Sequence, residues 1–135
     1  MTTRSALLTL TFASLVGCAP KPILQHVVLI DLKDDAGTAA LVVDCDRLLP
    51  QIPAVATYWC GTPATAPEFN RLGVDSQYDV ALCVGFKSAE DYRAYLIHED
   101  HLELVENWKP HMSWIRIHDV QIETWASGPT TLAKP

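Results

Sequence analysis

The chain has 135 residues, of which 49% are hydrophobic and 19% are charged. This length suits one domain of the usual ~100–150 residues and leaves no room for a second. The formal net charge of -6 argues against a nucleic-acid-binding protein, because contact with phosphates requires a concentrated surface of Lys and Arg.

The first 17 residues have the pattern of an export signal. Their apolar run over residues 6–16 is too short to span a bilayer. The motif that follows, Leu15-Val16-Gly17-Cys18, resembles the lipobox of bacterial lipoproteins, in which the cysteine is acylated and the preceding peptide is removed. The resemblance implies a signal peptide over residues 1–17 and a lipid on Cys18.

Several acyl chains on Cys18 would anchor the mature protein stably in a membrane. Residues 18–22, which contain two prolines, would form an extended tether between the lipid and the domain. Ala19 after the cysteine resembles lipoproteins of the outer membrane. We therefore expect a location in the cell envelope, on the periplasmic face of the outer membrane if the cell has one.

The domain is expected to extend over residues 23–125, followed by a flexible C-terminal tail over 126–135. Alternating apolar residues over 24–33 predict its first strand. Apolar side chains at helical spacing predict a helix that begins with Thr38 as its cap and ends at Pro50.

Two further strands, a long loop and two short helices are predicted next. Strands are expected over residues 54–60 and 78–86, with a loop rich in Pro, Thr and Ala between them. Ser88 followed by Asp91 indicates the start of the next helix, and Asp100 followed by Glu103 indicates another. The inward stripes of these two helices are Tyr92, Tyr95 and Leu96, then His101, Leu104, Val105 and Trp108.

A last strand over residues 114–123 completes the order β-α-β-β-α-(α)-β. This order predicts an α+β, ferredoxin-like fold, in which a four-stranded antiparallel sheet carries its helices on one face. Val27 and Leu29, with Ile115 or Trp114, are candidates for the other face. An uncovered apolar face of this kind indicates an interface.

Several motifs together resemble the stress-responsive A/B barrel (Dabb) family. They are His26 in the first strand, Phe86-Lys87-Ser88, the tyrosine-bearing helix after it, and the pair His98 and His101 that leads into the second helix. The resemblance covers about residues 24–123. It implies that two sheets meet as a dimeric α/β barrel, so that the partner is a second copy of the chain.

His26, Tyr95 and His101 are the candidate catalytic residues, because all three are expected to face one cavity between sheet and helices. In the Dabb family, a plant polyketide cyclase uses a tyrosine and a histidine that match Tyr95 and His101 in motif position. By this resemblance His101 would act as the base and Tyr95 as the donor to a developing enolate oxygen. The expected ligand-binding residues are Val28, Tyr92, His98 and Trp108.

Two functions follow from that cavity. The leading hypothesis is an exported, lipid-anchored protein that binds a small apolar or aromatic ligand, or a partner. The alternative is a cyclase or lyase that acts on a small carbonyl compound by acid–base chemistry. No cofactor is predicted, and no metal site, because His98 and His101 lack a third ligand at a diagnostic spacing.

The cysteines leave one question open at the level of sequence. Cys60 and Cys83 lie on strands expected to pair, but their register cannot be fixed, so a disulfide between them stays undecided. The default expectation is that Cys45, Cys60 and Cys83 are small buried thiols.

Overall fold

The computed structural model describes residues 22–34 and 37–123. The predicted signal peptide, Cys18, most of the tether and the C-terminal tail lie outside these residues. In the described part the elements are β1 (Leu24–Leu32), α1 (Thr38–Leu48), β2 (Thr57–Gly61), β3 (Val80–Phe86), α2 (Ala89–Leu96), α3 (Glu99–Trp108) and β4 (Met112–Gln121), with short 3-10 turns η2 (Leu49–Gln51), η3 (Pro67–Phe69) and η4 (Lys109–His111).

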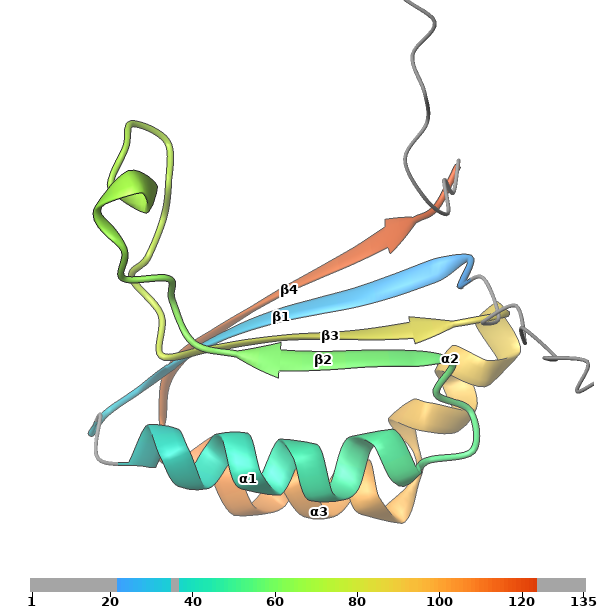
Figure 1. Ribbon diagram of the computed structural model, residues 1–135. Coiled ribbons are helices and arrows are strands. Elements are labelled where there is room, and N and C mark those ends of the chain that lie inside the picture. Colours follow the sequence, from blue (N-terminus) through green and yellow to red (C-terminus); the bar gives the residue numbers. More distant parts are fainter. Residues whose placement is uncertain (1–21, 35–36, 124–135) are drawn as a thin grey trace, which may run out of the picture.

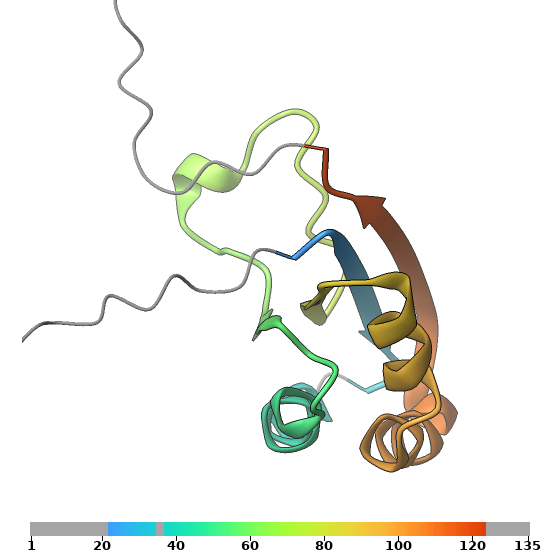
Figure 2. The same ribbon diagram turned by 90° about the vertical axis from the view of Figure 1, so that its right-hand side faces the viewer.

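The four strands form one antiparallel sheet in the order β2-β3-β1-β4. The helices α1 and α3 lie side by side on one face of this sheet (Figures 1 and 2). This arrangement confirms the predicted ferredoxin-like fold. It places β1 and β3 in the middle and leaves β2 and β4 as the two edges.

The core lies between the central strands and the helices. On β1, His26, Val28, Ile30 and Leu32 point to the helices and are buried, whereas the residues between them are half-buried. Every residue of β3 is buried. The alternation of apolar residues in the sequence of β1 therefore predicts its buried and its half-buried face correctly.

Two predicted helix starts differ from the structure. The N-cap of α1 is Gly37, and Thr38 is the first helical residue without a capping side chain. The N-cap of α3 is His98, whose Nδ1 accepts a hydrogen bond from the backbone N–H of Asp100 at 3.2 Å. The predicted start at Asp100 is therefore wrong, because a histidine lone pair replaces the usual capping oxygen two residues earlier.

The face of the sheet opposite the helices carries Val27, Leu29 and Trp114, as predicted. Ile115 is instead on the helix side, because it pairs with Ile30. The loop between β2 and β3 rises on the side of the sheet away from α1 and α3 (Figure 1). An ion pair at 3.4 Å between Asp75 of this loop and Arg116 of β4 ties the loop to the edge of the sheet.

Candidate active-site cavity

A cavity of about 460 Å³ lies between the sheet and the helices α2 and α3. It opens along the edge strand β4, where the lining residues Ile115 and Ile117 remain about half exposed. Its walls are mostly apolar. The lining residues are His26, Val28, Ile30, Leu41, Leu82, Tyr92, Tyr95, Leu96, His101, Leu104, Val105, Lys109, Met112, Ile115, Ile117 and Asp119.

The structure brings His26, Tyr95 and His101 together at this cavity. The ring centroids of Tyr95 and His101 are 4.4 Å apart, and those of His26 and Tyr95 are 5.9 Å apart. The three residues come from β1, α2 and the first turns of α3. The sequence-based expectation that they line one cavity agrees with their positions.

Asp119 of β4 holds the ring of His26 from the neighbouring strand. The carboxylate accepts a hydrogen bond from Nδ1 of His26 at 2.7 Å, and His26 pairs directly with Asp119 in the sheet register. The hydroxyl of Tyr92 donates to the other carboxylate oxygen at 3.0 Å. Burial, and then this hydrogen bond to Asp119, raise the pKa of Tyr92 to about 12, so the tyrosine keeps its proton near neutral pH.

His101 is held by the backbone at the end of α2. Its Nδ1 lies 3.1 Å from the carbonyl oxygen of Leu96, which can only accept, so Nδ1 carries the proton. Burial lowers the pKa of His101, and the hydrogen bond to the Leu96 carbonyl offsets only part of this effect. His101 is therefore a neutral imidazole near neutral pH, with the lone pair of Nε2 available as a base.

Three polar atoms face the cavity without a partner. Within the described residues every buried side-chain nitrogen or oxygen has a hydrogen-bond partner. The hydroxyl of Tyr95 and the Nε2 atoms of His26 and His101 make no hydrogen bond to any described residue. Since a buried atom would have a partner, these three atoms are not buried. They reach the open space of the cavity that their residues line. Burial also raises the pKa of Tyr95, which keeps its hydroxyl a donor.

Only two of the four expected ligand-binding residues line the cavity. Val28 and Tyr92 line the cavity. His98 caps α3 instead, and Trp108 lines a separate small hollow while its Nε1–H donates to a carboxylate oxygen of Asp44 at 2.9 Å. The stripe of α3 is thus split: its first residues face the cavity and its last packs beside α1.

The contact of Asp119 with His26 was not predicted from the sequence. Only the strand register reveals this contact. Because Ile115 pairs with Ile30, residues 115, 117 and 119 of the last strand all face the helices, and Asp119 lies beside His26. No spacing along the chain connects Asp119 with His26, which precedes it by 93 residues.

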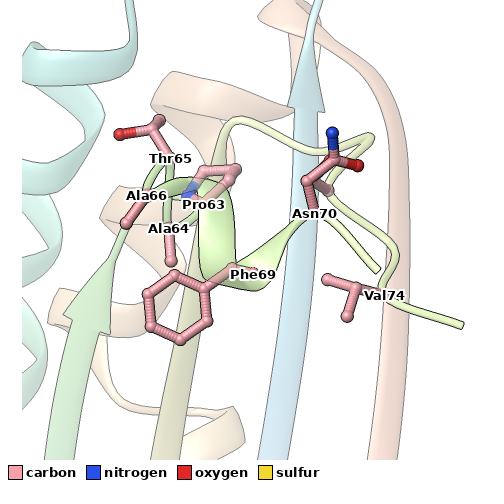
Figure 3. A pocket seen from close by; sticks show the side chains of 8 residues that line it. Pro63, Ala64, Thr65, Ala66, Phe69, Asn70 and Val74 are labelled. Carbon is pink, nitrogen blue, oxygen red and sulfur yellow. The ribbon is translucent and has the colours of Figure 1, made fainter. Parts of the chain in front are cut away.

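Another hollow, of about 440 Å³, is enclosed by the loop between β2 and β3. Figure 3 shows Phe69, Asn70 and Val74 around it. None of its lining residues is titratable, so acid–base chemistry has no group there. In the described part of the chain, no three His, Cys, Asp or Glu side chains are placed to hold a metal ion, and no helix is long and apolar enough to cross a membrane.

The fold and the cavity define a ferredoxin-like α+β domain with an acid–base cluster between its sheet and its helices. The chain belongs to the family of the stress responsive A/B barrel domain (Dabb), whose model matches residues 24–122. No curated protein matches the sequence.

Solved structures with the same fold share little sequence with the chain. A hydroxynitrile lyase from Passiflora edulis has 20% identity and a TM-score of 0.62, covering 79% of this chain and 100% of its own. A Dabb family protein from Mesorhizobium loti has 19% identity and a TM-score of 0.60, covering 77% and 100%. A dimeric ferredoxin-like protein of unknown function from Thermobifida fusca has 19% identity and a TM-score of 0.60, covering 73% and 90%.

Proposed function

We propose that the chain binds a small, mostly apolar molecule with an oxygen-bearing group in the cavity between its sheet and helices. The observation that carries this proposal is an open cavity with apolar walls, in which the Tyr95 hydroxyl and two imidazole nitrogens have no hydrogen-bond partner among the described residues. Such a combination of apolar walls and few convergent polar groups is typical of small-molecule sites. A carbonyl or hydroxyl group of the ligand would satisfy these atoms.

The spacing of the lining residues along α3 favours an elongated ligand. The polar cluster lies where α3 begins, and Lys109, just after the end of α3, also lines the cavity. Because His101 and Lys109 are eight residues apart, a helical rise of 1.5 Å per residue separates them by roughly 12 Å. Leu104 and Val105 lie between them, so the middle of the ligand should be apolar.

Native mass spectrometry of the protein purified from its own host tests the binding proposal. We expect a bound molecule in the wild type and its loss in the double variant Tyr95→Phe, His101→Ala. The matched control is Tyr58→Phe, His111→Ala, which changes the same residue types outside the cavity and should keep the molecule. Equal retention by both double variants would contradict a direct role of the polar cluster.

A second function, that of a lyase or cyclase acting by acid–base chemistry, is favoured by the hydrogen bond between His26 and Asp119. In His26, Nδ1 donates a hydrogen bond to the Asp119 carboxylate, so the lone pair of a neutral ring lies on Nε2 and can act as a base. In His101, Nδ1 donates to the backbone carbonyl of Leu96, with the same consequence. Either base could remove a proton next to a carbonyl group while the Tyr95 hydroxyl stabilises the enolate oxygen. A fold neighbour is a hydroxynitrile lyase.

Exchange of the methyl protons of a small aromatic ketone, acetophenone, into deuterated water measures this activity directly by NMR. General acid–base groups typically contribute 10²–10⁴-fold, so Tyr95→Phe and His101→Gln should each slow the exchange by about that range. Tyr58→Phe should not. Exchange no faster than in buffer would exclude proton abstraction from this ketone.

We also propose that the protein is exported and lipid-anchored at Cys18 in the cell envelope. The apolar run over residues 6–16 and the complete lipobox support this proposal. Changing Cys18 to Ser should release the protein from the membrane fraction. Membrane attachment that persists in this variant would contradict the anchor.

Finally, we propose that two copies pair through the sheet faces that carry no helices. Val27 and Leu29 are only half-buried there, and Trp59 of the edge strand is 52% exposed. Solved neighbours from Thermobifida fusca and Bacteroides fragilis are described as dimeric. Pairing of these faces would cover the apolar surface.

A further inference from the structure

Two cysteines belong to the same part of the core beneath the outer strand of the sheet, away from the cavity. Cys45 is on the inward side of α1 and is fully buried. Cys60 is on the helix-facing side of β2, packs against the same core and remains partly exposed. Because α1 runs below β2 (Figure 1), the two side chains approach each other from facing elements of one core. They are close enough that each shifts the pKa of the other.

The register of the sheet excludes the other possible pair. Cys83 pairs with Trp59 and therefore lies on the face without helices, whereas Cys60 pairs with Leu82 on the helix side. The two sulfur atoms consequently point to opposite faces of the sheet. The disulfide between Cys60 and Cys83 that the sequence left open cannot form in this fold.

The thiols of Cys45 and Cys60 differ in acidity. The hydrogen bond from Cys45 lowers the pKa of Cys60, and a hydrogen bond with Tyr58 acts in the same direction. The same contact and burial raise the pKa of Cys45, which therefore keeps its proton. The partly exposed thiol of Cys60 is thus the more acidic of the two, and a thiolate is the form that nucleophilic attack requires.

We propose that Cys45 and Cys60 form a reactive thiol pair that small disulfides such as oxidised glutathione convert into an internal disulfide. The thiolate of Cys60 attacks one sulfur of the small disulfide, whose S–S bond breaks and releases one thiolate. Cys45 then attacks the sulfur of Cys60 and passes its proton to that released thiolate. The second small thiol leaves as a thiolate and takes up the proton that Cys60 lost.

The resulting bond would join α1 to the edge strand β2. An edge strand is held by one neighbour only, so a covalent link to the helix below restrains the less supported side of the sheet. Closing the loop between the two cysteines also restricts the unfolded chain, which raises the melting temperature. This inference does not depend on a ligand in the cavity.

Peptide mapping by mass spectrometry of the full-length protein tests the proposal after the reduced protein is incubated with oxidised glutathione. We expect peptides that contain Cys45 and Cys60 to be linked, and no glutathione to remain on either. In Cys45→Ala the second step is blocked, so Cys60 should retain glutathione. The matched control Cys83→Ser should form the same internal disulfide as the wild type.

Two results would overturn the thiol pair. One is a Cys60 that stays free in the wild type after this incubation, because attack by Cys60 is the first step. The other is a stable glutathione adduct on Cys60 of the wild type, because Cys45 would then be unable to resolve it. A rise in melting temperature on oxidation, seen in the wild type and not in Cys45→Ala, would confirm that the bond forms in the folded protein.

Discussion

Asp119 determines which nitrogen of His26 carries the proton. The carboxylate can only accept, so it fixes the proton on Nδ1 and leaves the lone pair on Nε2, toward the cavity. An asparagine in its place can donate through its amide nitrogen. The ring would then be stable with the proton on Nε2 and would lose its base on the cavity side.

We therefore expect Asp119→Asn to slow ketone proton exchange by about 10²-fold or more if His26 is the base. The same NMR measurement of exchange checks this. Asp75→Asn is a suitable control, because it removes a carboxylate that pairs with Arg116 outside the cavity. An exchange rate that Asp119→Asn leaves unchanged would assign the base to His101 alone.

His101 couples folding to pH, because burial lowers its pKa in the folded state. The unfolded chain takes up a proton near the ordinary value of about 6.5, which the folded protein resists. The contribution of His101 to stability is therefore fully present above this value and is lost as the pH falls through the lower pKa of the folded state.

We predict that the free energy of unfolding declines less below pH 6.5 in His101→Gln than in the wild type. Gln is chosen because its amide can still donate to the carbonyl oxygen of Leu96. Urea unfolding at a series of pH values measures the difference, with His111→Gln as the control. Parallel curves for the wild type and His101→Gln would show that the burial of His101 does not oppose its protonation.

At the scale of the element, the start of α2 controls the position of two cavity tyrosines. Ser88 is its N-cap, and the hydroxyl oxygen accepts a hydrogen bond from the backbone N–H of Asp91 at 3.0 Å. Loss of such a cap typically costs about 1 kcal/mol. Tyr92 and Tyr95 lie on the helix that this cap begins.

Ser88→Ala should therefore lower the free energy of unfolding by about 1 kcal/mol, measured by urea denaturation. Ser113→Ala, an exposed serine in β4, provides the control and should change it little. Equal stability of Ser88→Ala and the wild type would mean that packing of the tyrosines, and not the cap, holds the start of α2.

The two helix starts show what a sequence reveals about caps. Serine is a preferred N-cap residue, so Ser88 was predicted correctly. His98 was missed because histidine caps a helix only when its ring is turned so that Nδ1 faces the backbone, which no propensity encodes. The element order and the two faces of β1 were predictable because they follow from hydrophobic periodicity.

At the scale of the whole molecule, the parts of the site that the sequence could predict are those on single periodic stripes. Tyr95 and His101 face inward by helical spacing, and His26 by strand alternation. The contact of Asp119 with His26 and the proximity of Cys45 to Cys60 depend instead on strand register and on how α1 lies across β2. These pairings join segments that are distant in the sequence. A shift of the strand register by one residue would turn each of the strand's side chains to the opposite face of the sheet.

The face of the sheet without helices is the surface through which two copies are proposed to pair. Leu29 lies on the central strand β1 and points to this face, opposite Ala81 of β3 and Arg116 of β4. In the proposed dimer its side chain would be buried against the partner's sheet, where an unpaired positive charge is strongly unfavourable. Leu29→Arg should therefore convert a dimer into a monomer at micromolar concentration, as measured by sedimentation velocity.

Val43→Arg is the matched control for this change, because Val43 is 63% exposed on α1, away from the sheet. It introduces the same side chain on the opposite side of the molecule and should leave the dimer intact. Dimers that persist in Leu29→Arg and dissociate in Val43→Arg would place the interface on the helices. A wild-type protein that sediments as a monomer would remove the argument for paired sheets, and Val27, Leu29 and Trp59 would then need a different partner.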